Sequence, residues 1–378
     1  MAKYKLGDIC EIVSGSTPKT SIDEYWDGDV KWITPVELND DSYIISDSAR
    51  KITELAVKKT GLTSFPEGTV ILSSRAPIGK VAIAGCEMYC NQGFKNLICS
   101  DKIINKYLYW FLKRNTHFLN SLGRGATFKE ISKAIVSEIE INVPEIEQQK
   151  KVVEILEKVS GIIARRKKEL SALDDLIKAR FVEMFGDPIK NPKGWEVVTI
   201  GDIVKEVKYG TSKPAVEGGK YPYLRMNNLT PDGHLDLNDL KYIDISEDEI
   251  EKCVVRKGDV LFNRTNSIEL VGKTAVFDLP DDMVIAGYII RVRLNERMLP
   301  EVLSQYMNLE ALKDILRSMA KGAVNQANIN AQELQNVKVY LPDMGLQKKF
   351  IEMKEQVDKS KVAILKNYSQ GGVLSYAN

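Results

Sequence analysis

One pattern of residues occurs twice along this chain, in the same order and almost two hundred residues apart. Leu6-Gly7-Asp8-Ile9 returns as Ile200-Gly201-Asp202-Ile203, and Gly79-Lys80 returns as Gly272-Lys273. Further matches join Gly93-Phe94 to Gly287-Tyr288, Gly125-Ala126 to Gly322-Ala323, and Pro144 with Gln149-Lys150-Lys151 to Pro342 with Gln347-Lys348-Lys349. A duplication of this length predicts two copies of one domain. Two similar halves suit a ligand that itself has two similar halves.

Composition places the chain among soluble globular proteins, with 44% hydrophobic and 28% charged residues. No apolar run approaches the roughly 20 residues that span a bilayer, and no signal peptide opens the sequence, so we expect a cytoplasmic protein without a membrane partner. The five cysteines are odd in number and lack a CxxC spacing, which argues against a disulfide framework or a zinc site. A formal net charge of +1 argues weakly against nucleic acid, unless basic residues gather on one face or a partner supplies phosphate contacts.

The pattern of apolar residues and turns divides the chain into five segments. We predict a mixed α/β (α+β) globule over residues 1–143, a long central helix over 144–186, a second globule over 187–341, a second long helix over 342–370, and a tail over 371–378. The predicted fold is therefore two homologous globular domains joined by two long antiparallel coiled-coil helices, with a pseudo-twofold internal repeat.

Both predicted helices carry apolar residues at alternating steps of three and four. The central helix has Val152, Leu156, Val159, Ile163, Leu170, Leu173, Ile177 and Met184; the second has Leu346, Phe350, Met353, Val357, Ser360 and Ile364. At ~1.5 Å per residue, about 39 residues make a rod of roughly 58 Å. Such a seam is too long for one globule to cover, which favours an antiparallel pair over packing of each helix on its own globule.

The second helix is expected to stop near Gly371-Gly372, earlier than the central helix does. The central helix is therefore expected to overhang its partner. We predict that amino-terminal sequence, the second globule or another subunit covers the end around Leu173, Ile177, Phe181 and Met184.

Signatures of catalysis are scarce. The two histidines, His117 and His234, are not repeat equivalents, which excludes a histidine metal cluster. Gly272-Lys273-Thr274 is similar to the end of a P-loop, but Ser267 stands where the first glycine is required. A DNA amino-methyltransferase would be expected to show a glycine-rich cofactor loop and an Asn/Asp-Pro-Pro-aromatic tetrapeptide, and the sequence has neither. We therefore predict no catalytic, metal or cofactor site in this chain.

Polar side chains gather in matching loops of both copies. Arg, Lys, Asn and Gln reach base edges in the major groove, and Ser, Thr and Lys suit phosphates. An arginine follows the same strand in each copy, Arg75 in the first and Arg264 in the second. The predicted DNA contacts are Ser73, Ser74, Arg75, Lys80, Asn91, Gln92, Lys95, Arg124, Thr127 and Lys129 in the first copy, and Arg225, Asn227, Asn228, Asn263, Arg264, Thr265, Asn266, Lys273, Lys321, Asn325 and Gln326 in the second.

Several of these stretches match one known family. They are the run Leu72 to Ala84, Asn91-Gln92-Gly93-Phe94-Lys95, Thr127-Phe128-Lys129-Glu130-Ile131-Ser132, the run Pro144 to Lys151, and the run Phe185 to Trp195. Over nearly its whole length the chain resembles the specificity subunit of type I restriction–modification systems.

The resemblance implies a non-catalytic DNA-recognition subunit. Residues 1–143 and 187–341 would be target-recognition domains, each reading half of a bipartite site in double-stranded DNA. The long helices would fix the spacing and dock two modification subunits, which carry the S-adenosylmethionine site. Restriction subunits, with motor and nuclease activity, would add to that core. A rod of roughly 58 Å corresponds to roughly 17 base pairs at ~3.4 Å per pair.

Three other readings compete with this one. A free-standing regulator could read a bipartite operator without enzymatic partners, and recovery of no methyltransferase subunit with the chain would favour it. A nuclease or methyltransferase would require metal-dependent cleavage or S-adenosylmethionine binding by the isolated chain. A pure scaffold would leave the polar loops without a role.

Overall fold

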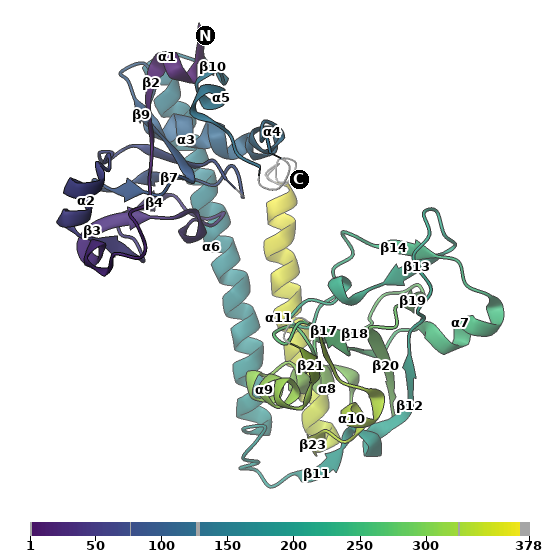
Figure 1. Ribbon diagram of the computed structural model, residues 1–378. Helices are drawn as coiled ribbons and strands as arrows, with labels where there is room; N and C mark the ends of the chain where they lie inside the picture. Colours follow the sequence, from purple (N-terminus) through teal and green to yellow (C-terminus); the bar gives the residue numbers. More distant parts are fainter. Residues whose placement is uncertain (1, 76, 126–128, 324–325, 371–378) are drawn as a thin grey trace. The chain divides into compact units, whose positions relative to one another are not determined.

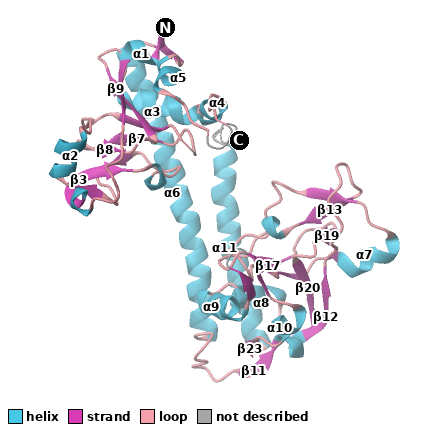
Figure 2. Ribbon diagram, in the orientation of Figure 1, coloured by secondary structure: helices cyan, strands magenta, loops and turns pink. Residues whose placement is uncertain are grey.

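The computed structural model describes residues 2–75, 77–125, 129–323 and 326–370. The chain divides into two compact units, residues 1–164 and 165–378 (Figure 1). Each unit combines helices with small sheets, as Figure 2 shows. The predicted tail, residues 371–378, lies outside the described residues.

Unit 1 is built on a five-stranded sheet. Its central strands are buried along their length because both faces carry Val, Ile, Leu and Ala side chains. The strand order is β2 (Cys10–Ser14), β9 (Phe94–Cys99), β6 (Val70–Ser73), β7 (Val81–Ala84) and β4 (Ile44–Ile45). A second sheet joins β5 (Lys51–Ile52), β3 (Trp26–Ile33) and β8 (Tyr89–Cys90), and β1 (Ala2–Lys5) pairs with β10 (Glu140–Val143). The helices are α1 (Leu6–Ile9), α2 (Glu54–Thr60), α3 (Asn105–Arg114), α4 (Thr116–Ser121) and α5 (Lys133–Ser137).

Unit 2 repeats this arrangement. The order β12 (Val204–Tyr209), β20 (Ile289–Leu294), β16 (Val260–Asn263) and β18 (Thr274–Val276) matches β2, β9, β6 and β7 of unit 1. Three further sheets lie in the described residues of unit 2. The first pairs β11 (Glu196–Thr199) with β23 (Lys338–Leu341), and the second has the order β14 (Lys241–Ile243), β13 (Tyr221–Leu224), β19 (Met283–Ile285) and β15 (Val254–Val255). The third has the order β17 (Thr265–Asn266), β22 (Gln326–Asn328) and β21 (Lys321–Ala323). The helices are α7 (Glu247–Cys253), α8 (Pro300–Met307), α9 (Glu310–Met319) and α10 (Ala331–Gln335). The predicted duplication and mixed fold class are confirmed.

Two long helices exceed all the others. The central helix, α6, runs over Ile146–Phe185, and α11 runs over Met344–Gln370. Within unit 2, the rings of Phe181 and Phe185 of α6 meet Phe350 near the start of α11, with centroids 5.2 and 5.5 Å apart. Farther along α11, Lys361 forms an ion pair with Asp174 of α6. Residue numbers rise along one helix as they fall along the other, so the predicted antiparallel pairing is confirmed in unit 2.

The prediction that α6 overhangs its partner around Ile177 and Phe181 is wrong. Both side chains are buried in the core of unit 2, and Leu173 and Met184 pack against that core. Antiparallel pairing places the start of α11 at this end, and Tyr306 of α8 also contacts Phe181. The second globule, one of the three predicted covers, therefore closes the end together with α11.

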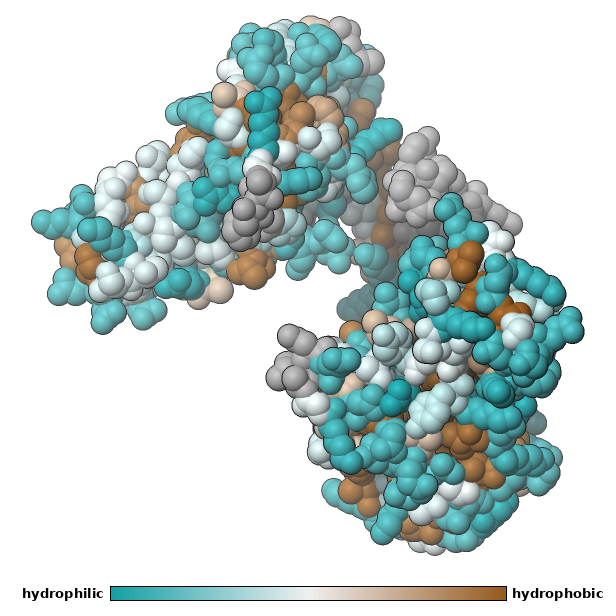
Figure 3. Space-filling model, turned by 45° about the vertical axis from the view of Figure 1, so that its right-hand side comes forward, coloured by the Kyte–Doolittle hydropathy of each residue, from teal (hydrophilic) through white to brown (hydrophobic). Residues whose placement is uncertain are grey.

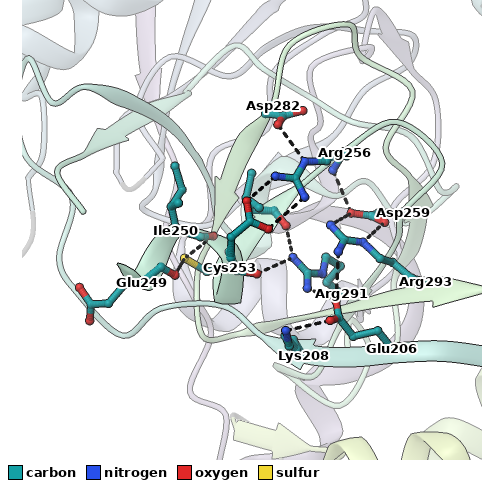
Figure 4. Close-up of polar contacts among 12 residues, drawn as sticks. Glu206, Lys208, Glu249, Ile250, Cys253, Arg256, Asp259, Asp282, Arg291 and Arg293 are labelled. Atoms are coloured by element: carbon teal, nitrogen blue, oxygen red, sulfur yellow. Dashed lines mark hydrogen bonds and ion pairs between the residues drawn. The ribbon is translucent and has the colours of Figure 1, made fainter. Parts of the chain in front are cut away.

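A charged network joins β12 and β20 to the segment around α7 in unit 2 (Figure 4). The side chain of Arg291 is fully buried; it pairs with Glu206 and donates to the Val254 carbonyl. Arg293 lies 3.1 Å from Glu206 and 2.9 Å from Asp259. Because a buried guanidinium is costly without partners, this network constrains how these elements pack.

Candidate nucleic-acid interface

Polar residues of unit 1 meet where β6 ends. Ser74 N donates to Gly93 O over 2.7 Å, and Ile131 N donates to Ser74 O over 3.0 Å. These bonds hold the strand end against the loop before β9 and against the hairpin that ends at Glu130. The hairpin turns at Gly125, whose φ of +129° suits glycine.

One carboxylate lies between two cations at this place. Arg75 Nε donates to Glu130 Oε2 over 2.9 Å, and Lys95 Nζ lies 3.5 Å from Glu130 Oε1 and 3.3 Å from Ser74 Oγ. Lys95 is buried, whereas the Arg75 side chain is 45% exposed. Arg124 pairs with Glu130 through the backbone and is exposed, as is Lys129. We name Arg75, Lys95, Arg124, Lys129 and Glu130 the unit 1 cluster.

Unit 2 builds the same place with different side chains. Arg264 N donates to Tyr288 O over 2.9 Å, and Ile329 N donates to Arg264 O over 2.9 Å. The Arg264 guanidinium donates to Asn328 Oδ1 over 3.0 Å and lies 4.9 Å from the centre of the Tyr209 ring. Lys321, at the start of the hairpin, is exposed and pairs with Glu333. We name Arg264, Asn328, Tyr209 and Lys321 the unit 2 cluster.

Strand register fixes which residues of the two clusters correspond. Ser73 lies opposite Phe94, and Asn263 lies opposite Ile289, so Ser73 corresponds to Asn263. Counting onward, Ser74 corresponds to Arg264 and Arg75 to Thr265. Arg75 and Arg264 both follow the same strand, as predicted, and lie one residue apart in register. The backbone pairing of the hairpins makes Glu130 equivalent to Asn328, and Arg124 equivalent to Lys321.

Seven of the predicted contact residues are buried in the fold. A buried side chain cannot reach a ligand outside without rearrangement, so direct contact of these residues with DNA stays a prediction that would require such a rearrangement. Ser73 Oγ donates to Pro77 O over 2.7 Å, and Asn263 Nδ2 donates to the Thr265 and Tyr288 carbonyls over 3.1 Å. The seven are Ser73, Ser74, Lys95, Asn228, Asn263, Thr265 and Lys273.

The repeated lysines both donate to backbone carbonyls of their own unit, and their contact with DNA stays a prediction. Lys80 Nζ donates to the carbonyl of Leu38, at the end of the 3-10 helix Pro35–Glu37. Lys273 Nζ donates to Leu229 O over 2.6 Å and to Met226 O over 2.7 Å, at the corresponding 3-10 helix Met226–Asn228. Burial lowers the pKa of Lys273. Each lysine stands immediately before a strand, β7 or β18, and thus ties the start of that strand to a short helix of its own unit.

The remaining predicted residues lie apart from this arrangement or are less constrained. Arg225 is half-buried and pairs with Asp239 over 2.6 Å. Asn91 Oδ1 accepts from Gly93 N over 2.9 Å, and Asn266 Nδ2 donates to Asn263 Oδ1 over 2.8 Å. Gln92, Asn227 and Gln326 are exposed. Thr127 and Asn325 lie outside the described residues.

Glu130, Tyr209 and Tyr288 also lie at this place and were not among the predicted contacts, whereas Asn328 belongs to the polar cluster that follows Lys321-Gly322 in the sequence. Tyr288 is 51% exposed beside the Arg264 backbone. Alignment of the two hairpins on Gly125 and Gly322 places Glu130 opposite Ala327, because the second hairpin is one residue longer. Only the backbone pairing makes Glu130 and Asn328 equivalent. The two tyrosines carry no signal in the sequence, because their roles depend on strand register.

A cavity or a metal-binding cluster is a weaker candidate for the functional site than the two clusters. A cavity of about 680 Å³ in unit 2 is lined by side chains of both signs, among them Asp174, Lys313 and Lys361. Over the described ranges, no three His, Cys, Asp or Glu side chains are placed to hold a metal ion, and no helix there is long and apolar enough to cross a membrane. The face seen in Figure 3 is largely hydrophilic, interrupted by smaller apolar areas.

Comparisons with known proteins point in one direction. The family model described as the type I restriction modification DNA specificity domain matches residues 1–173 and 192–370. The specificity subunit of the type I restriction enzyme MjaIX, from Methanocaldococcus jannaschii, is 40% identical over 247 residues, which cover 60% of this chain and 57% of that subunit. The EcoKI specificity subunit of Escherichia coli (strain K12) is 24% identical over 315 residues, covering 77% of this chain and 68% of that subunit.

Two solved structures share the fold. A chain from a study of complex assembly and conformational transition of the type I R-M system has a TM-score of 0.56 at 19% identity, covering 100% of this chain and 95% of that chain. The S subunit of a type I restriction-modification system from M. genitalium has a TM-score of 0.53 at 15% identity, covering 99% and 93%.

Proposed function

Because the chain belongs to the family of type I restriction modification DNA specificity domains, with two matched copies, we propose that it is the DNA-recognition subunit of a type I restriction–modification enzyme. Each unit reads one half of a bipartite target in double-stranded DNA. The long helices set the spacing between the half-sites and dock two modification subunits. The protein acts in the cytoplasm.

The observation that carries this proposal is the placement of cations at one equivalent strand end in both units. Arg75, Arg124 and Lys129 gather there in unit 1, and Arg264 and Lys321 gather there in unit 2. An arginine fork matches the O6 and N7 acceptors of guanine, and lysine and arginine neutralise phosphates. Local clustering of this kind reconciles DNA binding with a net charge of only +1.

The chemistry is assigned to partners. In this proposal the chain positions DNA and makes or breaks no covalent bond. S-adenosylmethionine binds in the modification subunits, and restriction subunits supply motor and nuclease activity. The names of the relatives, all specificity subunits, support this division of labour.

Selection of duplexes from a randomised library tests the proposal directly. The full chain, co-purified with its modification subunits, should enrich two short defined sequences separated by a fixed number of unspecified base pairs. Enrichment of one contiguous sequence, or of none, would contradict the assignment of one half-site to each unit. A free-standing regulator would be favoured instead if the chain on its own selected the same motif with equal affinity and if no methyltransferase subunit co-purified with it.

A further inference from the structure

The clusters of the two units differ most at one pair of equivalent positions, Glu130 and Asn328. In both units the residue comes from the returning strand of the hairpin and lies beside the end of β6 or β16. In both units its side chain touches the cation at that strand end. One copy has a carboxylate there and the other a neutral amide.

In unit 1 the carboxylate already has two cationic partners. Arg75 and Lys95 both face Glu130, at 2.9 and 3.5 Å. The Glu130 side chain is 34% exposed, so its charge also reaches the surface at which DNA would lie. A phosphate brought to Arg75 meets this carboxylate at short range, and the attraction of Arg75 for DNA is partly cancelled.

In unit 2 the residue that positions the guanidinium carries no charge, and the nearby carboxylate of Glu333 has its pKa lowered first by Lys321 and to a smaller extent by the charge of Arg264. Asn328 accepts one bond from Arg264 over 3.0 Å, and Asn328 Nδ2 in turn donates to Thr265 Oγ1 over 2.9 Å, which fixes the direction of the amide. The Tyr209 ring lies 4.9 Å from Arg264 Cζ. No carboxylate of the described residues forms an ion pair with Arg264; the nearby Glu333 accepts from Lys321 and from Asn330 N.

We propose that this position sets how strongly the neighbouring cation engages DNA: Glu130 restrains Arg75, whereas Asn328 orients Arg264 without placing a negative charge in contact with it. Both are positioning residues that act through the cation beside them. The inference rests on the proposed function. Its physical basis is that a competing carboxylate penalises non-specific phosphate contact more than a matched base contact, which provides discrimination.

Reciprocal charge changes test the inference in the complex of the full chain with its modification subunits. Glu130→Gln should tighten binding to a duplex with a scrambled half-site by roughly three- to tenfold, and should steepen the slope of log K against log salt by about one. Asn328→Asp should weaken binding by a similar factor and reduce that slope by about one. Glu138→Gln and Asn238→Asp, which change exposed residues of the same units, serve as charge-matched controls.

A double-mutant cycle separates positioning from a general charge effect. If Glu130 acts through Arg75, the gain from Glu130→Gln should fall at least by half in an Arg75→Ala background. The inference would be overturned if Glu130→Gln raised the affinity equally in both backgrounds, or if its salt slope matched those of the controls. The proposed function would still stand in that case, provided that the unmutated complex selects a bipartite motif. A parent complex that selects no such motif would contradict the proposed function, and this inference with it. Thermal unfolding of each variant shows that the comparison is made between folded proteins.

Discussion

Gln149 and Gln347 make the same three hydrogen bonds in the two units. Gln149 Oε1 accepts from Ile104 N over 2.8 Å, and its Nε2 donates to Lys102 O and Pro144 O over 2.9 Å. Gln347 accepts from Leu299 N over 2.9 Å and donates to Arg297 O and Pro342 O over 3.0 and 2.8 Å. Both side chains are fully buried. Each glutamine therefore fastens the start of a long helix to the loop that precedes α3 or α8.

Loss of this amide should loosen each long helix from its globule. Gln347→Leu leaves the Leu299 amide and two carbonyls without their partner, and a buried unsatisfied group costs about 1–3 kcal/mol. We expect the free energy of unfolding of unit 2 to fall by about 2–4 kcal/mol. Chemical denaturation measures the loss, and hydrogen exchange assigns it to α11. Lys348→Leu, at the adjacent exposed position, should change it little; equal losses in both variants would contradict this role.

The buried lysines should matter for stability and not for the DNA sequence selected. Lys273→Met removes two bonds to backbone carbonyls and should lower the free energy of unfolding by about 1–3 kcal/mol. The motif selected by the folded fraction should stay unchanged. A shifted base preference in unit 2's half-site, without loss of stability, would restore the sequence-based interpretation of Lys273 as a DNA contact.

The sequence predicted the architecture well because glycines, apolar residues and heptads report folding requirements. The repeated Gly125 and Gly322 marked equivalent hairpins, and the seam through Phe350 marked the helix pair. The same logic does not separate site from scaffold: Lys80 and Lys273 repeat, and both donate to backbone carbonyls within the fold. Arg75 and Arg264 were both placed after the same strand, but their contacts with Glu130 and Asn328 depend on strand and hairpin pairing, which the sequence does not display.

The Arg291 network should make unit 2 sensitive to acid. The Lys208 hydrogen bond and the charge of Arg291 hold the pKa of Glu206 below its ordinary value of 4.5. A carboxylate with a lowered folded-state pKa stabilises the fold above about pH 4.5, and this stabilisation is lost as pH falls through the folded-state pKa.

Glu206→Gln should remove that acid-dependent component and lower stability at neutral pH, because Arg291 then stays buried without its carboxylate, at a cost of about 3–5 kcal/mol. Unfolding free energies measured from pH 3 to 7 check both effects. Glu196→Gln, which breaks the exposed pair with Arg297, is the control. A pH profile unchanged in Glu206→Gln would contradict the assignment.

Lys313 should oppose stability at neutral pH. Burial lowers the pKa of Lys313 from 10.5 to about 8, and its Nζ has a 3.1 Å bond to Pro231 O. A lysine with a lowered folded-state pKa destabilises the fold fully below about pH 8, and the penalty is relieved as pH rises from about 8 to about 10.5. Lys313→Met should remove this protonation penalty and flatten the rise of the unfolding free energy above pH 8. Lys349→Met, at an exposed position, should do neither.

Exchange of one recognition domain tests most directly the central claim that each unit recognises one half of a bipartite target. Residues 1–143 are replaced by the corresponding segment of a relative that recognises a different target, the hybrid is expressed with its modification subunits, and methylated sites are mapped by sequencing the host genome. The account predicts that one half of the bipartite motif changes to that of the relative, while the other half is kept. A change in both halves, or in neither, would contradict the assignment of one half-site to each unit.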